Sequence, residues 1–501
     1  DVHMSRGLGD VYKRQMLVNP KIEEIKKTQF MVNKFQVRNP RSEKIDYFIT
    51  PPKSTEISAK CFSLRTAQIE WQNLGIEKRV EAIQQWKKNI VSHQEKLTKA
   101  LENDTGRLIE SRVEIESVIN SIDRCCQVAP ELLATGDSKT TKIPFIQLQN
   151  QLIPYQLVGI ISPWNFPLLL SLIDAIPALI TGCAVIVKPS EITPRFIQPL
   201  LETFSTIPVL QDIFTYIEGA GETGENLIEC VDFICFTGSI VTGQKVAEKA
   251  AKRFIPACLE LGGKDPAIVL DSADLELATS AILWGSVVNA GQSCLSIERV
   301  YVAASILRAF ITKLTEKAKR LKLAYPNIES GEIGPIILDK QADIITEHLQ
   351  DAVRQGAVIH CGGNVEKLDG GFWCLPTVLT QVNHSMKIMT EETFGPIMPV
   401  MSFATLEEAV RLANDTIYGL TAAVFAGSQT EALAVASQIN TGGVSINDAG
   451  LTALINEGEK NSFKLSGNGT SRMGADGMKR FLRKKAILSK VNSAPNPWWF
   501  K

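Results

Sequence analysis

The sequence predicts an α/β protein with a doubly wound, parallel sheet and a second α/β domain. Short β-branched strands alternate with helical segments from residue 158 onward, which is typical of a parallel sheet. The same alternation restarts after Pro266. With 501 residues, 45% of them hydrophobic, the chain is also too long for one compact core. We therefore expect two or three domains.

The N-terminal part predicts a leader, an arm and two helices. Residues 1–15 differ in character from the rest and are expected to be a non-native or disordered leader, so Met16 could be the true start. Residues 16–60 predict an arm that wraps the first domain. Apolar residues recur every three to four positions from Leu64 to about Leu101, which predicts a helix, and a second helix is expected over Arg107–Ala129.

Residues 139–158 predict a strand pair, because apolar and polar side chains alternate there. No helical segment nearby would cover this pair. The strands expected in the parallel sheet are Val158–Ile161, Ala184–Val187, Ile213–Ile217 and Asp232–Phe236, and a helix is expected from about Gly243. Ligands bind at the carboxyl ends of the strands in such sheets, so the polar segments that follow these strands are candidate binding segments.

The second domain is expected to repeat this organisation. Its predicted elements are an apolar strand at Ala267–Leu270, a helix at Asp274–Val288, a strand at Arg299–Val302, and helices at Ala309–Leu321 and Thr405–Asn414. Ala486–Leu488 predicts an edge strand. The most apolar run, 167–187, is interrupted by Asp174, Pro177 and Gly182, so we expect a buried helix, a turn and a strand rather than a membrane span.

Composition restricts the possible partners. The 53 basic and 54 acidic residues give a net charge of −1, which offers no field for nucleic acid or anionic lipid. The 10 cysteines form no C-x-x-C pair, the 5 histidines form no zinc motif, and we expect no metal site. Scattered cysteines fit a reducing compartment, so we expect a cytoplasmic protein that binds small molecules or copies of itself.

Cys294 is the best candidate for a nucleophile. It ends the segment Gly291-Gln292-Ser293-Cys294 after a predicted helix, where glycine lets the backbone approach a ligand closely. A thiolate attacks carbonyl carbon well. The other cysteines are expected to be buried packing residues, including the rival pair Cys125-Cys126, which lies in a helical setting without glycine.

Glu260 and Asn165 are candidates for the other catalytic groups. A glutamate beside two glycines is by itself a turn residue, but together with Cys294 it is a suitable base for activating the water that hydrolyses a thioester. Asn165 lies between Pro163 and Pro167, where its amide could donate to an oxyanion. An Asx-turn is the alternative for this residue.

Two segments suit a nucleotide, each with a simpler alternative. Gly238-Ser239-x-x-x-Gly243 follows a strand and opens a helix, where a phosphate could bind, but it is neither G-x-G-x-x-G nor a P-loop. Lys188 and Glu191 follow another strand and could bond ribose hydroxyls, or they could be solvated charges. Asp174 lies in an apolar helix and needs a partner or a function, so it could line a tunnel or make a core contact.

Together these motifs resemble the NAD(P)-dependent aldehyde dehydrogenase superfamily from about residue 40 to residue 490. The motifs occur in the order Pro163-Trp164-Asn165-Phe166-Pro167, Lys188-Pro189-Ser190-Glu191, Phe236-Thr237-Gly238-Ser239, Glu260-Leu261-Gly262-Gly263-Lys264, Gly291-Gln292-Ser293-Cys294, and Glu391-Glu392-Thr393-Phe394-Gly395-Pro396. The resemblance implies a Rossmann-type cofactor domain (16–138 and 159–261), an α/β catalytic domain (262–460) and a small β oligomerisation ribbon. In the ribbon, 139–158 is expected to pair with 483–493 of a neighbouring subunit.

The resemblance also implies residue roles. Cys294 resembles the nucleophile, Glu260 the deacylation base, and Asn165 with the Cys294 backbone amide the oxyanion hole. The residues implied to bind the cofactor are Trp164, Lys188, Glu191, Gly238, Ser239, Gly243, Leu261, Glu392 and Phe394. Lys188 and Glu191 resemble ligands of the adenosine ribose, and Glu392 that of the nicotinamide ribose.

The implied reaction oxidises an aldehyde to a carboxylic acid through a cysteine thiohemiacetal and a thioester. NAD is favoured over NADP because Glu191 would repel a 2′-phosphate, although NADP stays possible. A homodimer or homotetramer is expected. Apolar residues at the expected tunnel entrance, Leu170 and Ile173, favour a hydrophobic or aromatic aldehyde.

Three departures from the family pattern concern the substrate class. Asp174 stands where many members carry lysine, Cys183 replaces a common asparagine, and the segment Glu457–Asn461 lacks the usual Pro-Phe-Gly-Gly. Three other functions stay open: a CoA-acylating relative, which Glu260 opposes; a catalytically silent structural or binding protein; and a membrane-associated form that uses Trp498-Trp499-Phe500.

Overall fold

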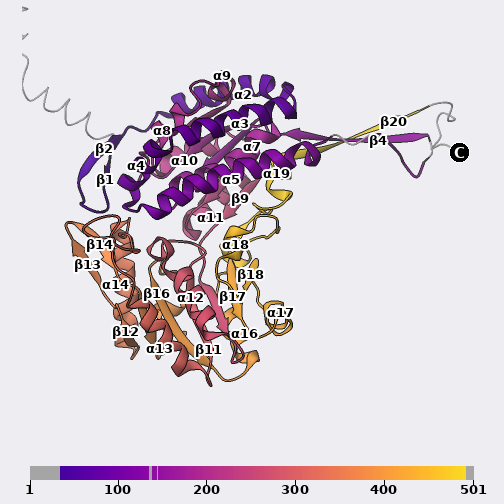
Figure 1. Ribbon diagram of the computed structural model, residues 1–501. Coiled ribbons are helices and arrows are strands. Elements are labelled where there is room, and N and C mark those ends of the chain that lie inside the picture. Colours follow the sequence, from indigo (N-terminus) through magenta and orange to yellow (C-terminus); the bar gives the residue numbers. More distant parts are fainter. Residues whose placement is uncertain (1–33, 135–137, 144, 492–501) are drawn as a thin grey trace, which may run out of the picture.

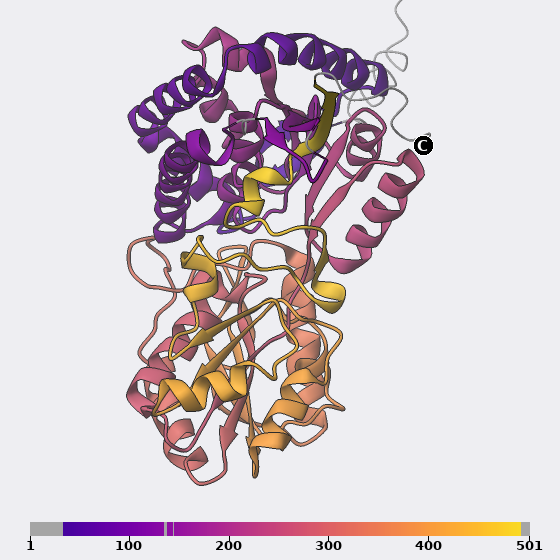
Figure 2. The same ribbon diagram turned by 90° about the vertical axis from the view of Figure 1, so that its right-hand side faces the viewer.

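The computed structural model describes residues 34–134, 138–143 and 145–491. Two large sheets, each covered by helices, lie one above the other in Figure 1, and a long thin ribbon projects from the upper one. Figure 2 shows how the C-terminal segment, in yellow, passes from the lower sheet back to the upper one. The predicted α/β class with two parallel sheets is confirmed.

The upper sheet has six strands in the order β19-β9-β8-β5-β6-β7, all parallel except β19. Its strands are β5 (Leu157–Ile161), β6 (Ala184–Lys188), β7 (Phe214–Tyr216), β8 (Phe233–Thr237), β9 (Ala257–Glu260) and β19 (Gly467–Asn468). The central strands β5, β6 and β8 are buried along their whole length, as expected for β-branched strands covered on both faces. The four strands predicted from the sequence are confirmed.

Helices and one hairpin surround this sheet. They are β1 (Phe35–Arg38), β2 (Ile45–Ile49), α2 (Ser54–Asn73), α3 (Ile76–Ser92), α4 (Gln94–Thr105), α5 (Ile109–Leu132), α6 (Pro167–Leu172), α7 (Ala175–Thr181), α8 (Ile197–Glu202), α9 (Pro208–Ile213), α10 (Gly221–Ile228) and α11 (Ile240–Arg253). The single helix predicted from Leu64 to about Leu101 is wrong: Gly75, at φ 83°, ends the first helical stretch, and a second break falls at His93. Within the described ranges, none of the helices combines the length and apolarity that a membrane crossing needs.

The lower sheet has seven strands in the order β12-β15-β16-β11-β10-β17-β18, and only the β12–β15 pair is antiparallel. Its strands are β10 (Asp265–Val269), β11 (Ile297–Ala303), β12 (Val358–Cys361), β15 (Thr377–Thr380), β16 (Ile397–Phe403), β17 (Thr421–Phe425) and β18 (Gly443–Ile446). The accompanying elements are α12 (Leu275–Val287), η1 (Val288–Gly291), α13 (Leu307–Ala318), α14 (Asp339–Arg354), β13 (Val365–Leu368), β14 (Gly371–Cys374), α15 (Lys387–Thr390), α16 (Leu406–Asn414), α17 (Gln429–Ala436), α18 (Leu451–Leu454) and η2 (Lys464–Ser466). The short helix α19 (Asp476–Lys479) packs instead against α7 beside the upper sheet.

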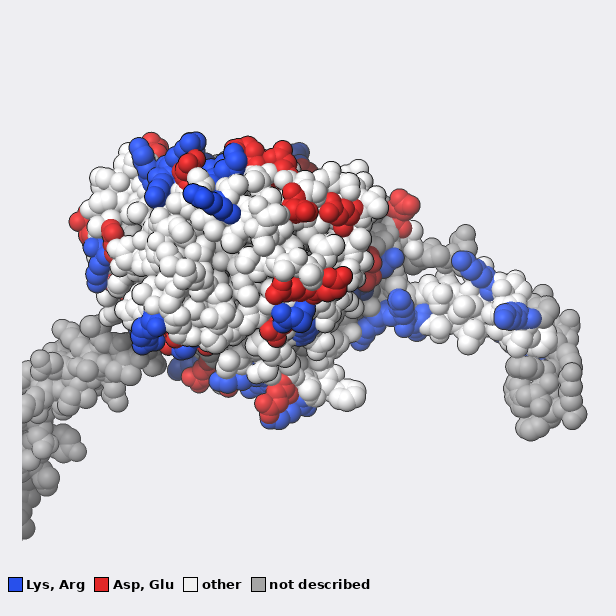
Figure 3. Space-filling view, turned by 90° about the horizontal axis from the view of Figure 1, so that it is seen from below, with Lys and Arg blue, Asp and Glu red and all other residues white. Residues whose placement is uncertain are grey.

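The ribbon consists of β20 (Leu482–Lys490), β4 (Ile146–Pro154) and β3 (Lys139–Thr140). Its main pairing, from Leu482 opposite Pro154 to Lys490 opposite Ile146, lies within one chain. The predicted pairing of these segments between neighbouring subunits is therefore wrong, because the nine-residue antiparallel register satisfies both strands locally. These strands carry basic side chains and no acidic ones, and the basic side chains are visible in blue along the ribbon in Figure 3.

Candidate active site

Cys294 lies in the loop between η1 and β11, and its backbone path is unusual. Asn289, Ala290 and Gly291 adopt consecutive left-handed conformations with φ of 56°, 52° and 72°. Such conformations are rare for residues other than glycine. A Cβ atom at Gly291 would lie 2.2 Å from the backbone carbonyl carbon of Gly395, so only glycine fits this close approach. The loop is thus turned sharply and held against the segment that follows Phe394.

A buried hydrogen-bond network joins this loop to Asn165. The Asn289 side-chain amide donates to the backbone carbonyls of Asn165 and Gln292 at 3.0 and 2.9 Å. The Asn165 Nδ2 donates to the same Gln292 carbonyl at 3.0 Å, and Arg107 Nη2 donates to the Asn165 carbonyl at 2.9 Å. These four residues are buried, so the network fixes the loop relative to the segment after β5.

Gln292 extends this network toward the other side of the loop. Its amide nitrogen donates to the carbonyls of Asn289 and Pro335, and its Oε1 accepts from the Ile337 N–H at 2.8 Å. Gln292 belongs to the sequence motif of Cys294, but Asn289 and Arg107 were not predicted to support this loop. Polar residues next to the motif glycine were the only signal that could have indicated this role.

Cys294 lines a small cavity of about 140 Å³. The cavity is lined by residues from both domains: Pro163, Trp164, Asn165, Leu170, Thr237, Gly238, Ser239, Glu260, Leu261, Gly262, Cys294, Gln341, Glu392 and Phe394. The Cys294 side chain is only partly exposed. Burial raises the pKa of Cys294 to about 12, with smaller contributions from Glu392, Asp265 and Glu260.

The structure brings the three predicted catalytic residues to this one cavity. Glu260 is the last residue of β9, Asn165 follows β5, and Cys294 enters from the lower sheet. Glu260 Oε2 accepts a hydrogen bond of 2.7 Å from Ser462 Oγ, a contact that the sequence did not predict. The rival cysteines, Cys125 and Cys126, are buried on α5 and line no part of this cavity.

A larger cleft of about 1080 Å³ adjoins the cavity at the carboxyl ends of β5, β6 and β8. Seven of the nine predicted cofactor residues line it: Trp164, Lys188, Glu191, Gly238, Ser239, Glu392 and Phe394. The other two predicted cofactor residues, Leu261 and Gly243, do not line this cleft. Leu261 lines the smaller cavity, and Gly243 packs against Leu261, where a Cβ atom would lie 2.5 Å from a Leu261 methyl.

The donors in this cleft suit a dinucleotide. Lys188 Nζ and Glu191 Oε2 form an ion pair of 3.0 Å after the end of β6, and both residues line the cleft. Ser239 is the N-cap of α11, a helix of 14 residues whose first turn presents backbone N–H groups to the cleft. An ion pair and a helix N-terminus therefore lie along one groove.

Glu392 and Phe394 lie where the cleft meets the cavity. Glu392 Oε1 accepts from the Gly263 N–H at 3.0 Å, and burial followed by the charge of Glu298 raises its pKa to about 8. The ring of Phe394 lies 5.5 Å from that of Trp164, centroid to centroid, in an edge-to-face arrangement.

Behind this site, Glu298 fixes the backbone that carries Phe394. Its carboxylate accepts from the N–H groups of Thr393 and Phe394 at 2.7 Å each and pairs with the buried Lys264 at 2.6 Å. The position of Phe394 is thus set by a buried ion pair on the adjacent strand β11.

Asp174 makes a core contact and does not line the active-site cavity. Its carboxylate accepts from Arg472 Nε and Nη2 at 3.1 and 3.0 Å and pairs with Arg480. Burial alone would raise the pKa of Asp174, but the two guanidinium groups outweigh it and hold the pKa below its ordinary value. The reversed charge at this position therefore has two cationic partners from the C-terminal segment.

The fold and this site together define a class: a two-domain enzyme with a nucleotide cleft, a cysteine nucleophile and a nearby carboxylate. The chain matches the aldehyde dehydrogenase family over residues 27–487. It therefore belongs to the aldehyde dehydrogenase family, whose activity is the NAD(P)-dependent oxidation of aldehydes.

Solved structures and curated relatives agree with this assignment. The chain is 64% identical to Putative Aldehyde Dehydrogenase PutA from Anabaena variabilis, with a TM-score of 0.92 over 93% of this chain and 100% of that one. It is 32% identical to betaine aldehyde dehydrogenase from Staphylococcus aureus in complex with NAD+, with a TM-score of 0.87 over 94% of each chain. A 4,4'-diapolycopene aldehyde oxidase of Methylomonas sp is 34% identical over 87% of this chain and 82% of its own length.

Proposed function

We propose that this enzyme converts an aldehyde to a carboxylic acid by covalent catalysis at Cys294, with Asn165 in the oxyanion hole and Glu260 as the base. The observation that carries the proposal is the convergence of these three side chains on one 140 Å³ cavity, which adjoins a cleft that suits a dinucleotide. No other cysteine lines that cavity.

In the first half-reaction the Cys294 thiol loses its proton to solvent and its sulfur bonds to the aldehyde carbon. The carbonyl oxygen becomes an oxyanion that accepts hydrogen bonds from Asn165 Nδ2 and the Cys294 backbone N–H. In the part of the chain that is described, this N–H donates to no protein acceptor, which supports the assignment. When bound, the oxidised nicotinamide supplies the acceptor for the hydride that leaves the substrate carbon.

In the second half-reaction a water molecule attacks the thioester while Glu260 takes its proton. The carbon–sulfur bond breaks, the carboxylic acid leaves, and the Cys294 thiolate is restored. The presence of a carboxylate in the cavity supports hydrolysis over transfer to CoA.

The proposed cofactor contacts follow the lining of the cleft. Lys188 and Glu191 would bind the adenosine ribose, Ser239 and the start of α11 the pyrophosphate, and Glu392 the nicotinamide ribose. We propose NAD as the preferred form, because a 2′-phosphate on that ribose would meet the Glu191 carboxylate.

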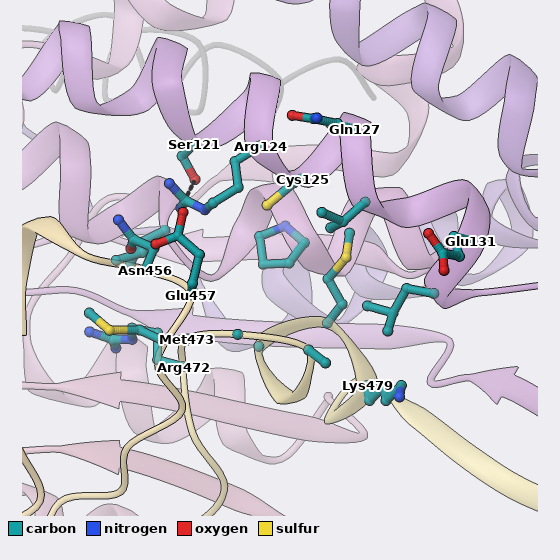
Figure 4. A pocket seen from close by; sticks show the side chains of 18 residues that line it. Ser121, Arg124, Cys125, Gln127, Glu131, Asn456, Glu457, Arg472, Met473 and Lys479 are labelled. Carbon is teal, nitrogen blue, oxygen red and sulfur yellow. Dashed lines mark hydrogen bonds between the residues drawn. The ribbon is translucent and has the colours of Figure 1, made fainter.

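An apolar aldehyde is the substrate class that we propose. Leu170 lines the catalytic cavity, and Ile173, three residues later on the same helical face, lines an outer cavity of about 660 Å³. Figure 4 shows this outer cavity between α5, which carries Arg124, and the segment with Arg472 and Met473. Leu132, Ile173, Pro177, Met473 and Met478 contribute apolar side chains to its lining, beside charged ones such as Arg124, Glu131 and Glu457. The relative named for 4,4'-diapolycopene aldehyde also supports this class.

The division into domains and the assembly are further proposals. We propose a cofactor domain of residues 16–138 and 159–261, a catalytic domain of residues 262–460, and a ribbon of residues 139–158 and 483–493. The ribbon projects from the body and exposes 66% of Leu488, which supports a homodimer or homotetramer. All ten cysteines lie in the described ranges and form no disulfide, which supports the proposed cytoplasmic location.

The test measures the oxidation of a panel of aldehydes by the absorbance of the NADH or NADPH that is formed. Hexanal, benzaldehyde, acetaldehyde and succinic semialdehyde are compared with NAD and with NADP, each with and without CoA. We expect NADH and free acid, with hexanal or benzaldehyde preferred, and no activity from Cys294→Ala. Acyl-CoA without free acid would contradict the hydrolytic mechanism, and an inactive wild-type enzyme would favour a silent binding protein.

A further inference from the structure

The two carboxylate oxygens of Glu260 have different surroundings. Oε2 accepts the 2.7 Å hydrogen bond from Ser462 Oγ, whereas Oε1 accepts no hydrogen bond from any of the described residues. Glu260 also lines the cavity that holds Cys294. One oxygen is therefore anchored, and the other is free for a water molecule in the cavity.

Ser462 is itself held from both sides. Two residues before it, the Lys460 N–H donates to the buried Ser471 hydroxyl at 3.0 Å, and one residue after it, the Phe463 N–H donates to the Gly419 carbonyl at 2.9 Å. The neighbouring Asn461 carbonyl lies so close to Gly442 that a Cβ atom there would meet it at 1.7 Å. A serine fixed by its neighbours can transmit that rigidity to the carboxylate that it contacts.

Two cations also face the Glu260 carboxylate from this side. Burial lowers the pKa of Lys460, while Glu260, Asp265 and Cys294 oppose that effect. Arg472, tied to Asp174 and to the Thr237 hydroxyl, is buried, yet Asp174 and then Glu260 hold its pKa above the ordinary value. Glu260 thus accepts one hydroxyl hydrogen bond and interacts electrostatically with two cations, all from the segments 457–463 and 471–476.

We infer that Ser462 is a positioning residue that fixes Glu260 Oε2, so that Oε1 receives the proton of the attacking water. The inference rests on the proposed role of Glu260 as the base. In that step the water oxygen bonds to the thioester carbon, its proton passes to Oε1, and the carbon–sulfur bond breaks to release the Cys294 thiolate. Ser462 lies next to residues 457–461, where the sequence departs from the family pattern, so the anchor belongs to a distinctive part of this chain.

The experiment measures each half-reaction separately with hexanal and NAD. The NADH burst reports formation of the thioester, and acid quenching followed by mass spectrometry reports its decay in a single turnover. We compare Ser462→Ala, Ser462→Thr and Ser437→Ala; Ser437 is an exposed serine at the end of α17 that donates only to a local carbonyl. We expect Ser462→Ala to slow thioester decay about tenfold without changing the burst, and Ser462→Thr, which keeps the hydroxyl, to restore decay to within about threefold of wild type.

Glu260→Gln distinguishes the failure of this inference from the failure of the proposed function. If Glu260→Gln accumulates thioester but Ser462→Ala behaves like Ser437→Ala, the positioning role of Ser462 is wrong while the base assignment stands. If the burst falls as much as the decay in Ser462→Ala, the serine acts on the whole site and the inference is also wrong. Unimpaired decay in Glu260→Gln would remove the base assignment and the inference together.

Discussion

Replacing Asn165 with alanine tests the oxyanion hole most directly. One N–H of the Asn165 amide holds the Cys294 loop, and the other is available to the substrate, so the two functions can be separated. The Asn165 amide nitrogen carries two hydrogens, and only one of them is used in the described protein, by the Gln292 carbonyl at 3.0 Å. The second hydrogen is available to the substrate oxygen. The Gln292 carbonyl also accepts from Asn289 at 2.9 Å, so it keeps a donor when Asn165 is truncated.

The expected effect follows from this geometry. One oxyanion donor is worth about 2.7–4 kcal/mol of transition-state stabilisation, which corresponds to a roughly 100- to 1000-fold loss of kcat. The loss of stability should be small, about 1 kcal/mol, because no buried acceptor is left without a partner. Asn165→Ala should therefore fold normally and lose activity.

The assay compares kcat for hexanal oxidation with the rate at which iodoacetamide alkylates Cys294. Alkylation requires the thiolate but no oxyanion, so we expect it to stay within about twofold of wild type while kcat falls. A kcat within fivefold of wild type would refute the oxyanion assignment. A parallel fall in both rates would instead mean that Asn165 positions the Cys294 loop.

Three further predictions concern ionisable groups, two at the site and one in the core. Because the pKa of Cys294 is raised to about 12, its alkylation rate should rise nearly tenfold per unit from pH 7 to 10 without a plateau. Glu191→Gln should raise kcat/KM for NADP relative to NAD by about tenfold, since it removes the charge that would meet a 2′-phosphate. Asp174→Asn should lower the free energy of unfolding by about 3–5 kcal/mol in urea titrations near pH 7, because it leaves buried Arg472 and Arg480 without their carboxylate.

Controls and contradicting results differ among these three. A plateau in alkylation near pH 8 would mean that the thiol is activated. An unchanged ratio of kcat/KM for NADP to kcat/KM for NAD would exclude Glu191 as the residue that discriminates between the cofactors.

For Asp174 the control is Asp123→Asn, which breaks a more exposed ion pair with Lys87 and should lower the free energy of unfolding by less than about 1 kcal/mol. Because the folded pKa of Asp174 is lowered, its contribution is full above about pH 4 and is lost as the pH falls through the folded value, so the variant and wild type should converge in acid.

Local patterns in the sequence were sufficient to predict the strands and the residues at their ends. Three of the four predicted strands of the upper sheet, β5, β6 and β8, are mainly apolar runs, as burial on both faces of a parallel sheet requires. Cys294, Glu260 and Asn165 could be singled out because each lies in a short motif with glycine or proline next to a predicted strand or helix. The break at Gly75 was missed because the apolar spacing continues on both sides of it.

Contacts between distant segments were not predictable in the same way. Asp174 and Arg472 are 298 residues apart, and nothing near either residue identifies the other as its partner. Ser462 lies 202 residues from Glu260, and a serine in a charged loop has no pattern that indicates a catalytic neighbour. Such pairs depend on how the C-terminal segment returns to the upper sheet, which periodicity does not determine.

The two proposed half-reactions depend on different parts of the chain. The Cys294 loop is fixed by Arg107, Asn165 and Asn289, two of which come from the upper domain. Glu260 is instead anchored by Ser462 from the segment that returns after β18. A change in residues 457–463 should therefore alter thioester hydrolysis while leaving its formation intact, whereas a change at Arg107 should alter formation first. One of the three departures from the family pattern, the segment 457–461, lies in this returning segment beside Ser462, so we expect this enzyme to differ from its relatives in the rate of thioester hydrolysis.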